Sequence, residues 1–179
     1  RKIIKFANKN KIPVIIDPKG KNFQKYNYAT LITPNLNEFQ EIVGRCLSIQ
    51  EIHQKGRKLL NKMKLQSLLI TKGENGMTLI EKNKKIIDYH SNASQVFDVT
   101  GAGDTVVASL ATSLAKSVSI KDATYISLRA AEIAVSKFGT DYVTQDELKK
   151  RLSNLDSLKK GIVNLSQLIN NLVELRKNG

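Results

Sequence analysis

Short apolar runs alternate along the chain with longer stretches in which apolar residues recur every three or four positions. Runs that are apolar on both faces are typical of strands buried in a parallel sheet, and the longer repeat is typical of covering helices. The runs predict strands at 12–17, 29–33, 67–72, 77–80 and 84–89. The repeats predict helices at 1–11, 35–43, 48–64, 106–114, 119–138, 144–152 and 162–175. Alternation of this kind predicts an α/β fold in three layers with a mainly parallel sheet.

The segment 98–104, Asp-Val-Thr-Gly-Ala-Gly-Asp, follows the strand-like residues 95–97 and leads into a helix. Glycine at 101 and 103 lets the backbone take positive φ and lets a ligand approach the main chain. The first N–H groups of a helix lack partners and lie at the positive end of its dipole, so this turn is suited to a phosphate. Asp104 is then a candidate acceptor for the proton of an attacking hydroxyl. Alternatively, the glycines only make a tight turn and Asp104 only favours the helix start.

Two further polar segments follow predicted strands, where ligands gather in open α/β sheets. The first is Asp17-Pro-Lys-Gly20, which could also be a plain turn. The second opens with Asn35, and Glu38 follows three residues later. That spacing predicts a capping box at the start of the helix 35–43, which is a complete structural account by itself.

Composition excludes several classes of protein. Lys and Arg exceed Asp and Glu by 29 − 16 = 13, but the lysines are scattered without interleaved aromatics, so we expect a solvated surface and no nucleic-acid partner. A single cysteine, Cys46, excludes an internal disulfide and suits a reducing, cytoplasmic compartment. His53 and His90 lack neighbours at ligand spacing, which argues against a metal site built on them. No apolar run reaches the roughly 18 residues of a membrane span.

The segment 98–104, with the small residues after it, resembles the second signature of the ribokinase-like (PfkB) carbohydrate kinases. This resemblance implies a ribokinase-like fold and makes Asp104 the catalytic base that deprotonates the acceptor hydroxyl. It also implies that the amides of Gly101, Ala102 and Gly103 form the anion hole for the transferring γ-phosphoryl group. ATP and a phosphorylated sugar are then the expected partners.

The resemblance extends to the segment Asn35-Leu36-Asn37-Glu38, which is similar to the Asn-x-x-Glu motif of the family. It implies that these four residues contact ATP and that Glu38 helps to hold Mg²⁺ through water. Lys72 and Gly73, at the end of a predicted strand, are expected in the nucleotide pocket; the alternative is a solvent-facing lysine before a hairpin. Asp98 and Thr100 match positions where many members bind a monovalent cation, which makes K⁺ a candidate.

Three segments, 16–20, 33–39 and 96–105, resemble the kinase half of the bifunctional heptose 7-phosphate kinases and heptose 1-phosphate adenylyltransferases. This implies ATP-dependent phosphorylation of D-glycero-β-D-manno-heptose 7-phosphate at O1, which gives the 1,7-bisphosphate for ADP-heptose and the lipopolysaccharide core. Lys19 would then meet the sugar phosphate or the nucleotide phosphates. Two alternatives stay open: a kinase of this family with another sugar, and a non-catalytic nucleotide-binding module.

The sequence does not begin with Met, and the first glycine-rich signature of the family is not in it. We therefore expect residues 1–153 to form the C-terminal portion of a kinase domain, inactive alone. Residues 154–179 are expected to be a linker and an amphipathic helix that leads toward a nucleotidyltransferase domain; a docking helix at the chain end is the alternative. A homodimer would form through the N-terminal half of the kinase.

Overall fold

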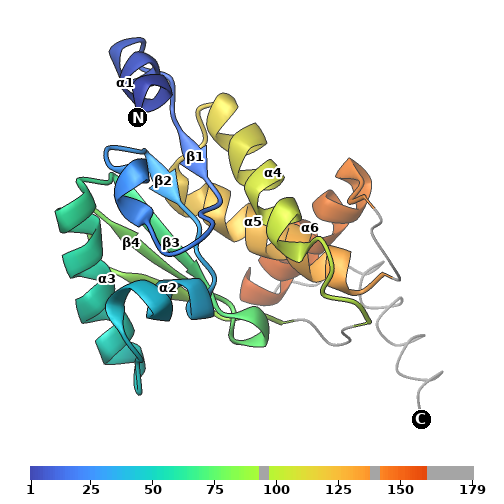
Figure 1. Ribbon diagram of the computed structural model, residues 1–179. Coiled ribbons are helices and arrows are strands. Elements are labelled where there is room, and N and C mark those ends of the chain that lie inside the picture. Colours follow the sequence, from blue (N-terminus) through green and yellow to red (C-terminus); the bar gives the residue numbers. More distant parts are fainter. Residues whose placement is uncertain (93–96, 138–141, 161–179) are drawn as a thin grey trace, which may run out of the picture. The chain divides into compact units, whose positions relative to one another are not determined.

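The computed structural model describes residues 1–92, 97–137 and 142–160 (Figure 1). The chain divides into two compact units, residues 1–142 and 143–179. All the strands and the candidate site belong to the first unit. Among the described residues, no helix combines the length and the apolar character that crossing a bilayer requires.

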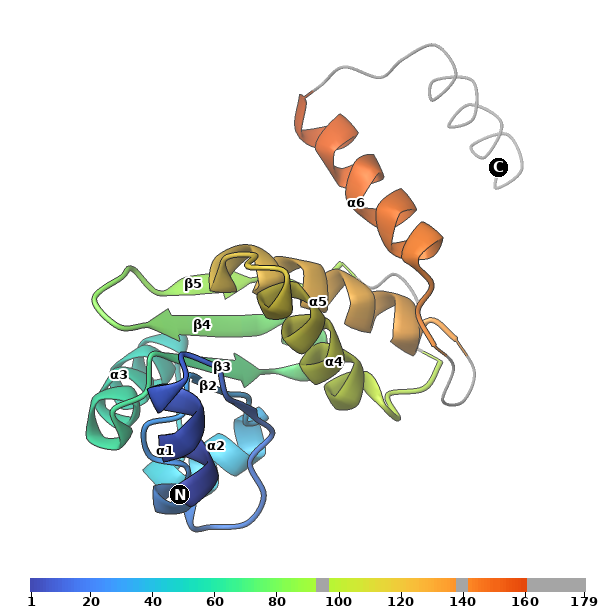
Figure 2. The ribbon, with the colours of Figure 1, turned by 90° about the horizontal axis from the view of Figure 1, so that it is seen from above.

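The first unit contains one sheet whose strands follow the order of the sequence (Figure 2). Strands β1, β2 and β3 are parallel, whereas β4 is antiparallel to β3 and to β5, so β4 alone runs against the others. The mainly parallel sheet that the sequence predicts is confirmed. The strands are β1 Ile15–Ile16, β2 Leu31–Ile32, β3 Ser67–Thr71, β4 Met77–Glu81 and β5 Ile87–Tyr89.

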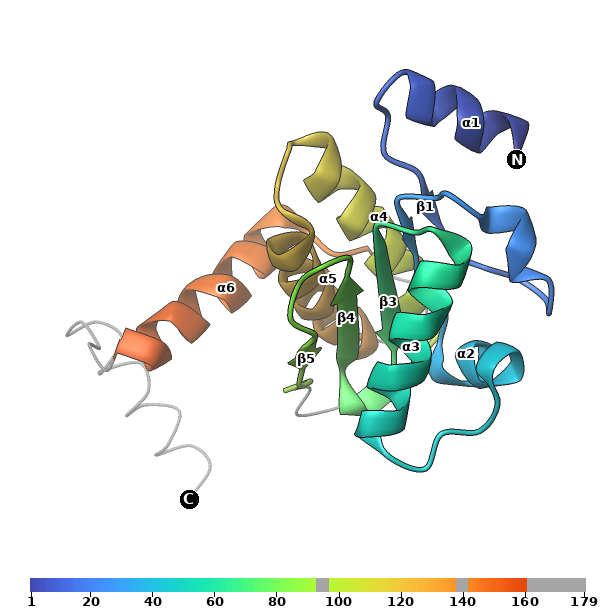
Figure 3. The ribbon, with the colours of Figure 1, turned by 90° about the vertical axis from the view of Figure 1, so that its left-hand side faces the viewer.

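Helices cover both faces of the sheet, which confirms the three-layer architecture (Figure 3). Helices α2 (Leu36–Val43) and α3 (Ile49–Met63) pack on one face, around a core that includes Phe39, Leu60 and Ile70. Helices α4 (Ala102–Ala115) and α5 (Ile120–Val135) pack on the other, around a core that includes Leu69, Leu110 and Ala123. The remaining elements of this unit are α1 (Lys2–Lys9) and the 3-10 helices η1 (Phe23–Tyr26) and η2 (Gly73–Asn75).

Most helices begin where the capping residues predict. Asn35 and Glu38 form the complete capping box of α2, since each side chain bonds the backbone of the other at 2.9 Å. The side chains of Ser48 and Ser119 accept the N–H three residues on and cap α3 and α5. These bonds are local, within one turn of the helix, so the sequence predicts them well.

Several elements differ from the prediction. The strands expected at 29–33 and 84–89 pair only at Leu31–Ile32 and Ile87–Tyr89. The strand expected at 12–17 pairs only at Ile15–Ile16, because Pro13 lacks an N–H and the chain leaves the sheet at Pro18. Helix α4 starts at Ala102, four residues early, so the glycine turn is its first turn. In the second unit, α6 (Gln145–Lys160) begins after the Thr144–Glu147 capping box but extends beyond residue 152. Helix α5 ends at Val135, with Ser136 as its C-cap, three residues before the predicted end at Phe138. Gln95, Val96 and the predicted helix 162–175 lie outside the described residues.

Candidate active site

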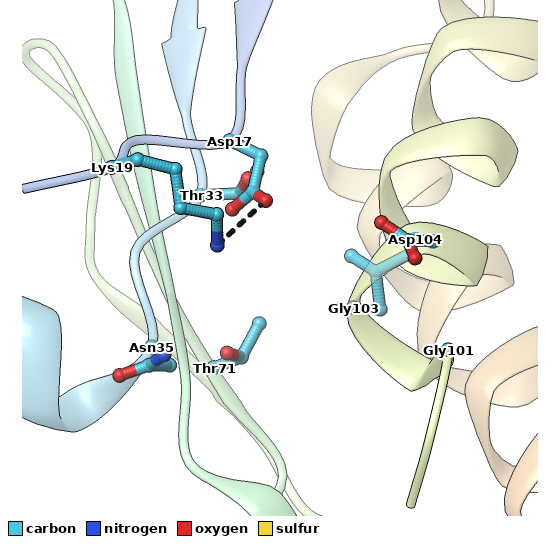
Figure 4. Close-up of a pocket in the computed structure, with 9 residues that line it drawn as sticks. Asp17, Lys19, Thr33, Asn35, Thr71, Gly101, Gly103 and Asp104 are labelled. Atoms are coloured by element: carbon cyan, nitrogen blue, oxygen red, sulfur yellow. Dashed lines mark ion pairs between the residues drawn. The ribbon is translucent and has the colours of Figure 1, made fainter.

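Parallel strands bring polar residues from distant parts of the sequence to one edge of the sheet. Asp17 directly follows β1, Thr33 follows β2, and Thr71 ends β3. The N-terminus of α4 faces this edge and closes a polar cavity of about 150 Å³ (Figure 4). The residues that line it are Asp17, Lys19, Thr33, Asn35, Thr71, Gly101, Gly103, Asp104 and Val106.

The glycine turn begins α4. Gly101 is the N-cap residue, with φ of 77° and ψ of −2°, a left-handed conformation that costs a side-chain-bearing residue energy. Thr105 reinforces the turn, because its N–H and its hydroxyl both donate to the carbonyl oxygen of Gly101, at 2.9 and 3.0 Å. The expectation of positive φ at both glycines is wrong for Gly103, which lies inside the helix. A Cβ atom at Gly103 would meet nothing within 4 Å, so this glycine keeps space open beside the cavity.

Asp104 lies in the first turn of α4 and is exposed to solvent. Figure 4 places it on the α4 side of the cavity, opposite Asp17 and Lys19. A carboxylate in a first turn interacts favourably with the helix dipole, and here it also borders the cavity at the helix N-terminus. Of the first N–H groups of α4, that of Ala102 donates to the carbonyl oxygen of Val99 at 3.2 Å. The arrangement brings a carboxylate and the N-terminus of a helix to the same cavity.

Lys19 carries the positive charge on the opposite wall. Its Nζ lies 3.0 Å from Asp17 Oδ2 and 3.2 Å from Glu38 Oε1. The hydrogen bond to Asp17 raises the pKa of the ammonium group; desolvation opposes this and Glu38 adds to it. The Lys19 side chain is 70% exposed, so both ion pairs lie on the solvent side of the cavity. The carboxylates of Asp17 and Glu38 thus converge on the Lys19 ammonium group.

Asp98 and Thr100 lie directly before the glycine turn. The Asp98 Oδ1 atom accepts the N–H of Thr100 at 2.8 Å, so this carboxylate shapes the turn. Within the described ranges, no group of three or more His, Cys, Asp or Glu side chains gathers in a way that could hold a metal ion. The monovalent-cation role of these two residues stays a prediction.

A second cavity of about 350 Å³ adjoins the first, and the two share Thr71, Gly103 and Val106. Its volume falls within the roughly 300–1,000 Å³ of small-molecule sites, which are mostly apolar. The other residues that line it are Gly73, Glu74, Gly76, Met77, Ser91, Val99, Ala102, Leu128, Ala131, Glu132 and Val135. The combined space is polar at the end near Asp104 and mostly apolar at the other.

Some of the predicted residues lie away from both cavities. Leu36 packs against the core between the sheet and helices α2 and α3, and Asn37 is exposed. The Lys72 side chain is only 8% exposed, and its ammonium lies 3.4 Å from Asp88 Oδ1 on β5. Its neighbour Gly73 does line the apolar cavity, as does Ala102 of the predicted anion hole. Their contacts with ATP stay predictions.

Asp88 is the centre of a polar cluster on the outer part of the sheet. It accepts the Thr78 hydroxyl at 2.6 Å and lies 2.8 Å from His53 Nε2. Burial raises the pKa of the Asp88 carboxyl, but the hydrogen bond from Thr78 and the charges of His53 and Lys72 outweigh it, so the net pKa is lowered. The sequence does not signal this cluster, because its members come from α3, β4, β5 and the end of β3, which meet only in the folded unit.

Sequence reasoning also missed most of the apolar cavity. Met77, Ser91, Val99 and Glu132 line it, and they come from a strand, two loops and a helix. No spacing pattern links residues so far apart in the chain. Thr33 and Thr71 could have been found, because both stand at the ends of predicted strands.

Comparison with known proteins gives one consistent result. The model of the pfkB family carbohydrate kinases matches residues 1–147. The chain is 47% identical over 152 residues to the bifunctional protein HldE of Pasteurella multocida (strain Pm70), which covers 85% of this chain and 32% of that protein. It is 44% identical over 153 residues to an uncharacterized sugar kinase of Buchnera aphidicola subsp. Schizaphis graminum, which covers 86% of this chain and 49% of that protein.

Solved structures agree on the fold. The chain is similar to the Arabidopsis thaliana ribokinase complexed with ribose and ATP, with a TM-score of 0.76, 25% identity, and coverage of 84% of this chain and 50% of that one. It is also similar to the Escherichia coli phosphofructokinase-2 in complex with potassium, with a TM-score of 0.76, 21% identity, and coverage of 87% and 51%. The chain thus spans about a third of the HldE protein and about half of the Buchnera sugar kinase and of the ribokinase that it matches.

Proposed function

The chain belongs to the pfkB family of carbohydrate kinases, and on this premise we propose that it supplies the ATP site and the catalytic base of a sugar kinase. One observation carries the proposal: Asp104 and the glycine turn border a polar cavity that opens into a mostly apolar one. A nucleotide has the same two parts, since it joins a charged phosphate chain to a flat, mostly apolar base.

We orient ATP with its base in the 350 Å³ cavity and its γ-phosphate at the N-terminus of α4. The cavities meet at Thr71, Gly103 and Val106, where the sugar and α-phosphate of the nucleotide would pass. The absence of a side chain at Gly103 allows the phosphates to come close to the helix N–H groups, which favour negative charge.

Asp104 would act as the general base. The acceptor hydroxyl transfers its proton to the Asp104 carboxylate, its oxygen bonds to the γ-phosphorus, and the bond from that phosphorus to the β-phosphate oxygen breaks to release ADP. The N–H groups of Gly101 and Gly103 would stabilise the charge on the transferred group, and that of Ala102 would do so once it leaves the carbonyl oxygen of Val99. Lys19, on the opposite wall, would neutralise phosphate charge as it leaves Asp17 and Glu38.

Asp17 and Glu38 fit a magnesium ion, because carboxylates are ligands that Mg²⁺ prefers and both already converge on the Lys19 ammonium. They would hold the ion directly or through water. When bound with ATP, Mg²⁺ supplies positive charge to the β- and γ-phosphates. For K⁺, Asp98 and Thr100 remain the candidates, in line with the potassium complex of the E. coli phosphofructokinase-2.

For the acceptor we propose D-glycero-β-D-manno-heptose 7-phosphate, phosphorylated at O1 in the cytoplasm. Identity of 47% to an HldE protein over the kinase region supports this choice. A kinase of the same family with another sugar acceptor is the second candidate, because the Buchnera relative, at 44% identity, is named only as a sugar kinase. The role of residues 154–179 as a link to a transferase domain, and a homodimer, remain parts of the proposal.

The test measures ATP consumption by the complete gene product that carries residues 1–179, with heptose 7-phosphate, fructose 6-phosphate or ribose as acceptor. Asp104→Asn should lower kcat by roughly 10²–10⁴-fold, the usual contribution of a general base. Asp122→Asn is the matched control, since Asp122 also lies in the first turn of a helix but lines neither cavity. Turnover with another sugar only would discard the heptose assignment, and equal turnover by wild type and Asp104→Asn would discard the base.

A further inference from the structure

A buried ion pair on α5 has no part in the mechanism above. Arg129 and Glu132 are 3% and 4% exposed, and Arg129 Nη1 lies 2.8 Å from Glu132 Oε2. Desolvating two charges is costly, and such a pair can often be replaced by apolar residues without loss of stability.

Both charged groups hold the segment 90–92, which follows β5. Arg129 Nη2 donates to the carbonyl oxygen of His90 at 3.1 Å. Glu132 Oε1 accepts the N–H of Asn92 at 2.6 Å and the hydroxyl of Ser91 at 3.3 Å. Ser91 and Glu132 line the apolar cavity, so the ion pair fixes one of its walls.

Helix α5 also holds the segment before the glycine turn, at the proposed phosphate end of the site, but through its backbone and not through side chains. One turn beyond Glu132, the carbonyl oxygen of Val135 accepts the N–H groups of Phe97 at 2.8 Å and Asp98 at 3.4 Å. These residues lead into the glycine turn. The phosphate end thus depends on a backbone group of α5, whereas the wall of the apolar cavity depends on side chains. Substituting the side chains should therefore disturb one end only.

We propose that Glu132, itself held by Arg129, is a positioning residue for the base of the nucleotide. It sets the wall at 90–92 against which the base packs, without contacting the reacting atoms. This inference rests on the proposed binding of ATP, and it predicts that affinity for the base and affinity for the phosphates can be separated.

The experiment is calorimetric titration of the full chain with Mg-ATP and, separately, with Mg-tripolyphosphate, which lacks the base. Glu132→Gln keeps the size of the side chain but weakens its charge-assisted bonds and leaves Arg129 without its counter-ion. It should weaken ATP binding about tenfold, as expected for the loss of roughly one charge-assisted hydrogen bond, and change tripolyphosphate binding less than about twofold.

Two further variants keep the result interpretable. Glu81→Gln is the matched control, because Glu81 is also buried and also pairs with a residue three positions on, Lys84 at 2.8 Å, but lines neither cavity. It should bind ATP as wild type does. The double variant Arg129→Met/Glu132→Leu removes both charges and should stay folded, yet it should show the same selective loss of ATP affinity.

Each outcome decides the inference. A selective loss of ATP affinity in both Glu132 variants supports it. Unchanged ATP binding in the double variant overturns the inference, and so does an equal loss of affinity for ATP and for tripolyphosphate. Either result leaves the proposed kinase function standing. If wild type does not bind ATP at all, the inference falls together with the nucleotide site.

Discussion

Replacing Gly103 with alanine should stabilise the fold while it blocks the phosphate site. Gly103 is the second residue of α4 and has a helical backbone, so alanine fits without strain. Its added Cβ would contact no atom within 4 Å. Glycine in a helix is less favourable than alanine by up to about 1 kcal/mol. Because the site is in the first turn, we expect a gain of about 0.5 kcal/mol in the free energy of unfolding.

The same methyl group should weaken nucleotide binding, because Gly103 lines both cavities. Forcing a phosphate away from the helix N–H groups costs the interaction that an open glycine allows. Overpacking of one methyl group costs about 1–3 kcal/mol, which corresponds to a Kd for Mg-ATP roughly 5- to 150-fold higher. Urea unfolding and calorimetric titration of the same preparation measure the two effects.

Gly101→Ala is the matched variant in the same turn. At φ of 77° a Cβ atom is strained, so this change should destabilise the fold by about 1–2 kcal/mol. The two alanine substitutions, one residue apart, should therefore change the free energy of unfolding in opposite directions. A loss of stability in Gly103→Ala, or ATP affinity in that variant equal to wild type, would refute our interpretation of the turn.

Two other predictions concern stability. Because the pKa of Asp88 lies below its ordinary 3.8 in the folded state, the ionised carboxylate stabilises the fold above that pH, and this contribution is lost as the pH falls through the folded pKa. Asp88→Asn should thus cost about 1 kcal/mol at pH 7 and progressively less in acid, as urea unfolding at several pH values would measure; a difference that is independent of pH contradicts this. Gly56→Ala should cost about 1 kcal/mol despite its gain in helix propensity, because the new Cβ would overlap Ile80 Cδ1 in the core. Adding Ile80→Val removes that atom and should restore stability in thermal unfolding, whereas equal melting of both variants argues against the overlap.

The sequence predicted well those features that depend on residues within one turn of each other. The Asn35–Glu38 capping box and the turn at Gly101 are examples, because their hydrogen bonds join residues three or four positions apart. The alternation of apolar runs and helical repeats also predicted the layers. A strand buried on both faces is a continuous apolar run, and a helix buried on one face has apolar residues every three or four positions.

Side-chain direction at the strand ends was not predictable in the same way. Thr71 is the last residue of β3 and Lys72 follows it. Thr71 lines both cavities, whereas the Lys72 ammonium group pairs with Asp88. Successive residues of a strand point to opposite faces, so a shift of one position decides which face a side chain serves. A pattern that places a strand end to within one or two residues leaves that choice open.

By itself, therefore, the sequence determined the family, the order of the elements and the residues of the glycine turn, because each follows from local geometry or from a short motif. Only the tertiary structure decided that Lys19, after β1, reaches Glu38 on α2 and that Glu132 holds Asn92 beside an apolar cavity. The physical reason is that these contacts join residues from neighbouring strands and helices. Their distances are set by the packing of the whole sheet and its covering helices, and no local pattern records them.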